Sequence, residues 1–236
     1  MPVYKLPEEP VFPRPDLAEE DGLLAIGGDL SAERLLNAYA SGIFPWYSKG
    51  QPVLWWSPDP RMVLFPENFL RHKNLRRTVD KNIYTWSFDQ HFEQVVEQCS
   101  RVKRKGQAGT WITDEMKEAY VHLHKLGFAH SVETYDQGKL AGGLYGVSLG
   151  SVFFGESMFH LKTDASKVAL WHLVDFSIQQ GIRLIDVQQN TTHLKSLGAE
   201  TISREKFLVL LRQNLRAETL QGNWQKWNDK KTESDE

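Results

Sequence analysis

The segment RLIDVQ, residues 183–188, places two polar side chains in an apolar strand. Its Leu, Ile and Val residues favour a buried β-strand. Side chains alternate along a strand, so Asp186 and Gln188 leave the same face. A carboxylate buried among apolar residues is costly unless it is paired or hydrogen-bonded. The spacing therefore indicates a site where a carboxylate and an amide act side by side.

The segment FFGESMF, residues 153–159, has the same pattern. Glu156 interrupts a strand that is otherwise built from phenylalanine and methionine. Because both segments are predicted strands of one sheet, we expect Glu156, Asp186 and Gln188 to lie close together as the polar floor of a pocket. The alternative for Glu156 is a carboxylate on an edge strand that faces water.

Tryptophans and basic residues point to a nucleic-acid partner. Four tryptophans lie in Pro- and Gly-flanked segments, where they either form the core of a small domain or stack on nucleobases: Trp46, Trp55, Trp56 and Trp111. Basic residues cluster between residues 71 and 81 and again at residues 101–105. A basic run is usually a solvated surface, but two runs near these tryptophans favour binding to a phosphate backbone.

The 236-residue chain is 41% hydrophobic and 25% charged, which is typical of a soluble globular protein of one large or two smaller domains. Its net charge of −2 gives no general sign of a nucleic-acid partner. No apolar run is long enough to cross a membrane, and the acidic, Pro-rich start is unlike a signal peptide. The single Cys99 favours the reducing cytoplasm. The eight histidines show no metal-ligand spacing, so no metal site is expected.

Apolar periodicity and turn residues predict the order of helices and strands. Ser31 and Thr113 are expected N-caps, and Gly42 and Gly127 are expected C-terminal stops. Helices are predicted near residues 31–41, 89–100, 113–126 and 164–180, and strands at residues 129–135, 139–150, 151–159 and 183–188. This order predicts an α+β protein, a sheet layered with helices. Prolines break the segment between residues 45 and 66 into short pieces, so we predict a small N-terminal domain over residues 1–62 and a larger domain over residues 63–236.

The sequence resembles the leucyl/phenylalanyl-tRNA–protein transferase family from about residue 12 to residue 207. The resemblance is carried by motifs in the family's order, among them GIFPWY, LWWSPDPR, GTWIT, GGLYGV, FFGESMF and LIDVQ. It implies a cytoplasmic bacterial enzyme that moves Leu, Phe or sometimes Met from aminoacyl-tRNA to proteins that begin with Arg or Lys. Such transfer tags the acceptor for degradation through the N-degron pathway. The implied fold is a small N-terminal domain joined to a domain of the GCN5-related acetyltransferase (GNAT) type, without metal or cofactor, and we expect a monomer.

The resemblance also implies roles for particular residues. Asp186 and Gln188 match the pair proposed to act on the α-amine of the acceptor, and Glu156 matches a carboxylate of the acceptor side. Trp46 and Trp111 match residues that hold the 3′-terminal adenosine of tRNA. The apolar pocket for the amino-acid side chain corresponds to Leu144, Met158, Leu170, Leu173 and Ile185. Ser177 stands where a member of the family has Phe, and neighbouring Phe176 is the candidate to fill that space, so this position bears on the shape of the pocket.

The chemistry of these residues suggests a mechanism. The ester of an aminoacyl-tRNA is already activated, so the enzyme has to align it with the attacking amine. Gln188 can accept a hydrogen bond from that amine, Asp186 can orient and polarise Gln188, and phosphate contacts from Arg76 and Arg77 suffice for broad use of tRNA.

Two other functions stay open. An acyl-CoA-dependent N-acetyltransferase requires a pyrophosphate-binding loop after a strand, and the nearest string, KRKGQA, follows a predicted helix. A noncatalytic RNA-binding protein would explain the tryptophans and basic runs, but it would leave the three polar strand residues without a role.

Overall fold

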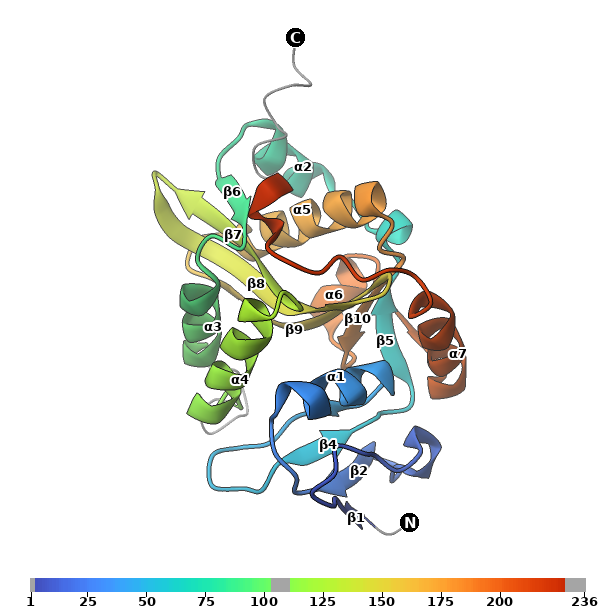
Figure 1. Cartoon of the computed structure of the whole chain (residues 1–236). Coiled ribbons are helices and arrows are strands. Elements are labelled where there is room, and N and C mark those ends of the chain that lie inside the picture. Colours follow the sequence, from blue (N-terminus) through green and yellow to red (C-terminus); the bar gives the residue numbers. More distant parts are fainter. Residues whose placement is uncertain (1–2, 103–110, 228–236) are drawn as a thin grey trace.

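The computed structural model describes residues 3–102 and 111–227, which form two β-sheets flanked by helices (Figure 1). In these residues the smaller sheet has the strand order β1-β2-β4-β3, and the larger one has the order β11-β5-β10-β9-β8-β7-β6. The smaller sheet comprises β1 (Tyr4–Lys5), β2 (Leu23–Ile26), β3 (Phe44–Pro45) and β4 (Leu54–Trp56). The larger sheet comprises β5 (Arg61–Leu64), β6 (Thr85–Phe88), β7 (Ala129–Asp136), β8 (Lys139–Leu149), β9 (Val152–His160), β10 (Leu184–Gln188) and β11 (Glu200–Ile202).

Helices cover both faces of the larger sheet. The α-helices of the described residues are α1 (Ala32–Ala40), α2 (Lys73–Asp80), α3 (Phe92–Arg101), α4 (Asp114–Lys125), α5 (Ala165–Gln180), α6 (Thr192–Ser196) and α7 (Arg204–Asn214). Short 3-10 helices span Pro15–Leu17, Pro66–Asn68 and Trp224–Trp227. In Figure 1, α3 and α4 lie on one face of the larger sheet and α5 lies on the other. None of these helices is long and apolar enough to span a membrane.

Each face of the larger sheet has its own apolar core. One core joins α3 and α4 to α1 and the smaller sheet, and it includes Phe154 of β9. The other core lies beneath α5 and includes Phe153 of β9 and Ile185 of β10, whose side chains leave the face of the sheet opposite to that of Phe154. The α+β architecture predicted from the sequence, with strands followed by a helix and a further strand, is confirmed.

Local sequence determines where α1 and α4 begin. The Ser31 hydroxyl oxygen accepts a hydrogen bond from the backbone N–H of Arg34 at 3.3 Å, and Thr113 Oγ1 accepts one from that of Met116 at 3.3 Å. α1 ends before Gly42, whose φ of +77° is the left-handed conformation that favours glycine. These predicted caps and this predicted stop are confirmed.

The segment between residues 69 and 105 differs from its prediction. The sequence predicts one helix there, whereas the structure has α2, β6 and then α3. α2 was missed because Leu75 is its one buried residue, so its apolar periodicity is weak. β6 was missed because it is a short edge strand that pairs with β7 alone.

The predicted domain boundary at residue 62 falls within β5. This strand pairs with β10 on one side and with β11 on the other, so it belongs to the larger sheet from Arg61 onward. The strands of the smaller sheet end at Trp56. Division into residues 1–62 and 63–236 remains a proposal from the sequence.

β9 and β10 are paired over only part of their length, which leaves a gap between them in the larger sheet. These parallel strands are in register from Val152 and Leu184 to Phe154 and Asp186. Beyond that point β9 remains paired with β8, and β10 continues along β5 through a bulge after Asp186. The two strands therefore separate where Glu156 and Gln188 occur.

Candidate active site

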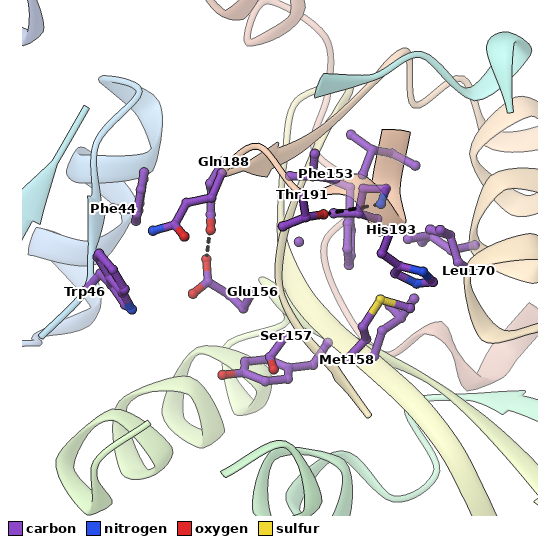
Figure 2. Close-up of a pocket in the computed structure, with 18 of the residues that line it drawn as sticks. Phe44, Trp46, Phe153, Glu156, Ser157, Met158, Leu170, Gln188, Thr191 and His193 are labelled. Atoms are coloured by element: carbon purple, nitrogen blue, oxygen red, sulfur yellow. Dashed lines mark hydrogen bonds between the residues drawn. The ribbon is translucent and has the colours of Figure 1, made fainter. Parts of the chain in front are cut away.

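A cavity of about 360 Å³ opens where β9 and β10 separate. Its lining includes the aromatic residues Phe44, Trp46 and Trp111, and Phe44 and Trp46 lie at one end. It also includes the apolar residues Leu144, Phe153, Met158, Leu170, Leu173 and Ile185, of which Phe153, Met158 and Leu170 lie toward the other end. Glu156 and Gln188 lie between these ends, as Figure 2 shows with Phe44 and Trp46 on one side and Leu170 and His193 on the other.

The structure brings most of the predicted site residues into this one cavity. Glu156, Gln188, both predicted adenosine-binding tryptophans and all five predicted pocket residues line it. Asp186, Arg76 and Arg77 are not among the described residues that line it. Asp186 lies directly behind the wall, whereas the two arginines are exposed on α2.

Glu156 is held by three hydrogen-bond donors. Its Oε1 accepts from the hydroxyl of Tyr39 at 2.7 Å and from Gln188 Nε2 at 2.8 Å, and its Oε2 accepts from the hydroxyl of Tyr120 at 2.7 Å. The side chain is buried, and this burial raises its pKa to about 7 against the lowering effect of the hydrogen bonds. The carboxyl group can therefore gain or lose a proton near neutral pH.

The contact with Glu156 fixes the orientation of the Gln188 amide. Because Nε2 donates to Glu156, the carbonyl oxygen of the same amide is directed elsewhere and can accept a hydrogen bond from a bound group. The backbone of Gln188 has a φ of +62°, an uncommon conformation for a residue other than glycine, at the bulge of β10. The bulge thus directs Gln188 into the cavity.

Asp186 forms a buried ion pair behind Gln188. Arg61 donates to both of its carboxylate oxygens, from Nε at 2.8 Å and from Nη2 at 2.6 Å. Asp186 Oδ1 also accepts the backbone N–H of Gln188 at 3.0 Å. The guanidinium of Arg61 lies 4.7 Å from the ring centre of Phe44 and 4.6 Å from that of Phe207. Asp186 therefore holds the backbone of Gln188, whereas the side-chain amide of Gln188 donates to Glu156.

Three residues of this network were missed by the sequence reasoning. Tyr39 and Tyr120 lie on the buried faces of α1 and α4, where apolar periodicity gives no sign of a role for their hydroxyl groups. Arg61 did carry a signal, because an arginine that opens the apolar run RMVL poses the same question as the aspartate in LIDVQ.

The tryptophans divide between core and cavity. Trp55 is fully buried, packs edge-on against Phe12 and donates its indole N–H to the carbonyl of Gly27 at 2.8 Å. The indole N–H of Trp56 donates to the carbonyl of Trp46 at 2.6 Å, which fixes the backbone that presents Trp46 to the cavity. Of the four tryptophans considered, Trp46 and Trp111 line the cavity.

Other predictions concern residues outside the cavity. Ser177 is fully buried in α5 and is not among the cavity-lining residues, and neighbouring Phe176 packs on Phe88 and Trp224. Of the second basic run, residues 103–105 lie outside the described residues.

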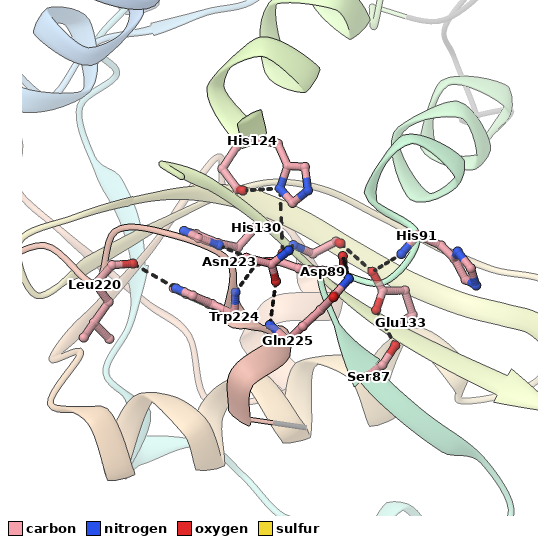
Figure 3. A network of polar contacts seen from close by, with 12 residues as sticks. Ser87, Asp89, His91, His124, His130, Glu133, Leu220, Asn223, Trp224 and Gln225 are labelled. Carbon is pink, nitrogen blue, oxygen red and sulfur yellow. Dashed lines mark hydrogen bonds and ion pairs between the residues drawn. The ribbon is translucent and has the colours of Figure 1, made fainter. Parts of the chain in front are cut away.

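A second buried polar network fastens the C-terminal segment to the larger sheet (Figure 3). Asp89 Oδ2 accepts the backbone N–H of Trp224 at 2.8 Å and lies 2.9 Å from His130 Nδ1. The rings of His130 and Trp224 are stacked with centroids 3.7 Å apart. Burial lowers the pKa of His130, which favours a neutral ring. None of these residues is among the described residues that line the cavity, and they hold the segment around Trp224 against the sheet.

Comparisons with known proteins assign the chain to a family. The family model "Leucyl/phenylalanyl-tRNA protein transferase" matches residues 63–212, and the model of its N-terminal domain matches residues 28–59. A leucyl/phenylalanyl-tRNA–protein transferase of Maridesulfovibrio salexigens is 58% identical over 95% of this chain and 94% of its own length. The protein of the same name from Syntrophobacter fumaroxidans is 57% identical over 91% of this chain and 92% of its own length.

Solved structures that match parts of the chain share little sequence with it. L-PGS from Bacillus licheniformis is 13% identical, with a TM-score of 0.38 over 71% of this chain and 53% of its own. An aminoglycoside acetyltransferase from an uncultured soil metagenomic sample is 18% identical, with a TM-score of 0.36 over 50% of this chain and 84% of its own. The family models and the close relatives decide the assignment: the chain belongs to the leucyl/phenylalanyl-tRNA–protein transferase family.

Proposed function

We propose that the cavity binds the aminoacyl end of a charged tRNA and that the enzyme transfers Leu, Phe or Met from it to the N-terminal Arg or Lys of an acceptor protein. The family supplies the reaction, aminoacyl transfer from tRNA to protein. One observation carries the residue-level proposal: a single cavity joins an aromatic end, a polar middle and an apolar end in that order. An aminoacyl-adenosine has the same sequence of parts, namely base, ester and apolar side chain.

The aromatic end suits the terminal adenine. Stacking of a base on an aromatic side chain contributes about 1–3 kcal/mol, and Trp46 and Trp111 offer two such rings. The apolar end suits an aliphatic or aromatic hydrophobic side chain. Because one methylene group is worth only about 1–3 kcal/mol in such a pocket, we expect Leu, Phe and Met all to be accepted.

The polar middle suits aminolysis of the ester. The acceptor's α-amine attacks the ester carbonyl and a C–N bond forms. The C–O bond to the ribose breaks, the nitrogen loses a proton, and the departing ribose oxygen takes up a proton to become a hydroxyl group. An α-amine has a pKa of about 7.7–8.0, so a useful fraction is neutral. Alignment of amine and ester can supply roughly 7–11 kcal/mol of the barrier reduction. The Gln188 carbonyl oxygen accepts a hydrogen bond from the amine, and Asp186 with Arg61 keeps Gln188 in position.

Glu156 gives the site a preference for a cationic acceptor. The guanidinium or ammonium group of an N-terminal Arg or Lys placed near Glu156 would favour its ionised form, and a charge-assisted contact would follow. The raised pKa of this carboxyl, about 7, makes its charge sensitive to such a neighbour. An apolar acceptor residue would gain no such contact.

The test is a transfer assay without ATP or CoA. Purified protein is incubated with radiolabelled Leu-tRNA and two peptides that differ only in an N-terminal Arg or Ala. Label on the Arg peptide alone is expected. Gln188→Ala should lower kcat with little change in KM for Leu-tRNA, because Gln188 acts on the attacking amine. Label on neither peptide, despite binding of the charged tRNA, would contradict the proposal and favour a noncatalytic RNA-binding protein.

A further inference from the structure

The apolar end of the cavity contains one titratable side chain whose role the reaction leaves unassigned. His193 belongs to α6, the short helix that follows β10, and it lines the cavity. Figure 2 shows its ring beside Met158 and Leu170. His193 is exposed in the fold as well, so its ring lies at the rim that separates the apolar end from solvent.

The other walls of the apolar end belong to long strands and a long helix, whereas the wall that includes His193 belongs to a short helix. Met158 and Ile185 belong to strands of the sheet, and Leu170 belongs to the long helix α5. α6 has five residues and is started by Thr191, whose Oγ1 accepts the backbone N–H of Leu194 at 3.2 Å. The residues of α6 therefore lie between the apolar end of the cavity and solvent.

We propose that His193 is a specificity-determining residue, whose ring closes the apolar end of the cavity and limits the size of the transferred side chain. This inference rests on the proposed function, since it concerns the same pocket. The imidazole edge packs beside Met158 and Leu170, and removal of the ring extends the apolar end toward solvent. A larger side chain, such as the indole of tryptophan, then fits.

The electrostatic surroundings keep His193 neutral. Partial desolvation at the rim, together with the nearby Lys167 on α5 and His160 at the end of β9, lowers the pKa of His193. Lys167 itself is bonded to Asp164 at 2.8 Å, Lys195 lies on α6, and Glu156 lies in the middle of the cavity. A lowered pKa means that His193 becomes charged only below its ordinary range, and a charge at that point would oppose entry of an apolar side chain.

The experiment measures selectivity, so that a general loss of activity cancels. We would determine the ratio of kcat/KM for Trp-tRNA to that for Leu-tRNA with the Arg peptide. We expect the ratio to rise about 10-fold in His193→Ala and to stay near the wild-type value in Lys195→Ala, an exposed neighbour on the same helix. His193→Gln, which fills more of the space and does not titrate, should give an intermediate ratio.

The pH arm uses the same variants. As the pH falls from about 8 to about 5.5, Leu transfer by the wild type should decline relative to His193→Gln, because the His193 ring gains a charge and the glutamine does not. Protonation of the acceptor amine slows both proteins equally. Unchanged Trp/Leu ratios in His193→Ala, with Leu transfer intact, would overturn the inference.

A binding measurement separates this inference from the proposed function. Adenosine carrying Leu or Trp through a stable 3′-amide is titrated into wild type, His193→Ala and Lys195→Ala by calorimetry. A wild type that binds the Leu compound but transfers nothing would count against the proposed reaction alone. A Trp/Leu affinity ratio that rises in His193→Ala would still support the role of His193, and an unchanged ratio would overturn it.

Discussion

At the scale of single residues, Glu156 combines deep burial with hydrogen bonds from Tyr39, Tyr120 and Gln188. Its pKa is about 7 in the folded protein against an ordinary value of 4.5. Between these values the folded chain binds more protons than the unfolded chain, so the free energy of unfolding falls as the pH rises. The stabilising contribution of protonated Glu156 to the free energy of unfolding is fully present below about pH 4.5 and is lost above about pH 7.

We expect Glu156→Gln to remove this part of the pH dependence. Through Glu156 the wild type should lose roughly 3 kcal/mol of unfolding free energy across this interval, at about 1.36 kcal/mol per pH unit. Urea unfolding at several pH values measures the slope. Glu97→Gln is the control, because Glu97 is partly exposed and a hydrogen bond from Lys117 lowers its pKa. Equal slopes in wild type and Glu156→Gln would contradict the raised pKa.

The buried pair of Arg61 and Asp186 gives a second prediction at this scale. Arg61→Met leaves the Asp186 carboxylate buried without its two guanidinium contacts, at a cost of about 3–5 kcal/mol in unfolding free energy. Adding Asp186→Asn removes the unpaired charge and should restore more than half of that loss. Denaturant unfolding of the two single variants and the double variant measures it, and strictly additive losses would argue against the pairing.

At the scale of elements, the site depends on how β8, β9 and β10 depart from regular pairing. β8 and β9 have a bulge between Tyr145 and Gly146, and a Cβ atom on Gly146 would lie 2.2 Å from the backbone oxygen of Phe154. Only glycine permits this approach of the strands. Gly155 follows Phe154 in β9, and a Cβ atom on Gly155 would contact only the backbone oxygen of Asp186, at 3.6 Å.

These two glycines form a matched pair for a test. Gly146→Ala should force β8 and β9 apart and lower the unfolding free energy by about 2 kcal/mol or more. Gly155→Ala should leave stability within about 1 kcal/mol of wild type while it narrows the cavity, which Gly155 lines, and raises KM for Leu-tRNA. Thermal unfolding measures the stability of both variants, and transfer kinetics measure their KM for Leu-tRNA. Equal destabilisation by the two changes would contradict the idea that the close approach of the strands at Gly146 requires glycine.

At the scale of the whole molecule, the site exists only where the two sheets meet. Tyr39 comes from α1 beside the smaller sheet, Tyr120 from α4 and Gln188 from β10, and all three donate to Glu156 of β9. Phe44 contributes both to the cavity and to the ring pair around Arg61. Both sheets must therefore be in place before the cavity is complete.

tRNA binding also belongs to this scale, because it requires a surface larger than the cavity. Arg76→Ala combined with Arg77→Ala on exposed α2 should weaken binding of all Leu- and Phe-tRNAs about equally and should reduce the salt dependence, since phosphate contacts carry no sequence information. Filter binding at several salt concentrations measures both effects. Lys206→Ala with Arg212→Ala removes the same charge from exposed positions of α7. A loss confined to one isoacceptor, or equal to that of the α7 control, would refute the assignment.

Local patterns were sufficient for much of this protein. The caps at Ser31 and Thr113 depend on residues three positions apart, and the strands at β7 to β10 depend on apolar residues next to one another. The same patterns identified Glu156, Asp186 and Gln188 as polar groups that require partners. Those partners could not be predicted in the same way, because periodicity does not say which distant residue lies opposite.

The sequence by itself thus determined the α+β order of elements, the family and the positions of the polar strand residues. Only the tertiary structure decided what each residue contacts. Asp186 meets Arg61, 125 positions away, because β5 and β10 are neighbours in the sheet. Glu156 meets Tyr39, 117 positions away, because α1 and β9 share one core. The two carboxylates have different roles because their tertiary partners differ. Asp186 is paired with Arg61 and holds the backbone of Gln188, whereas Glu156 is surrounded by neutral donors and titrates near pH 7.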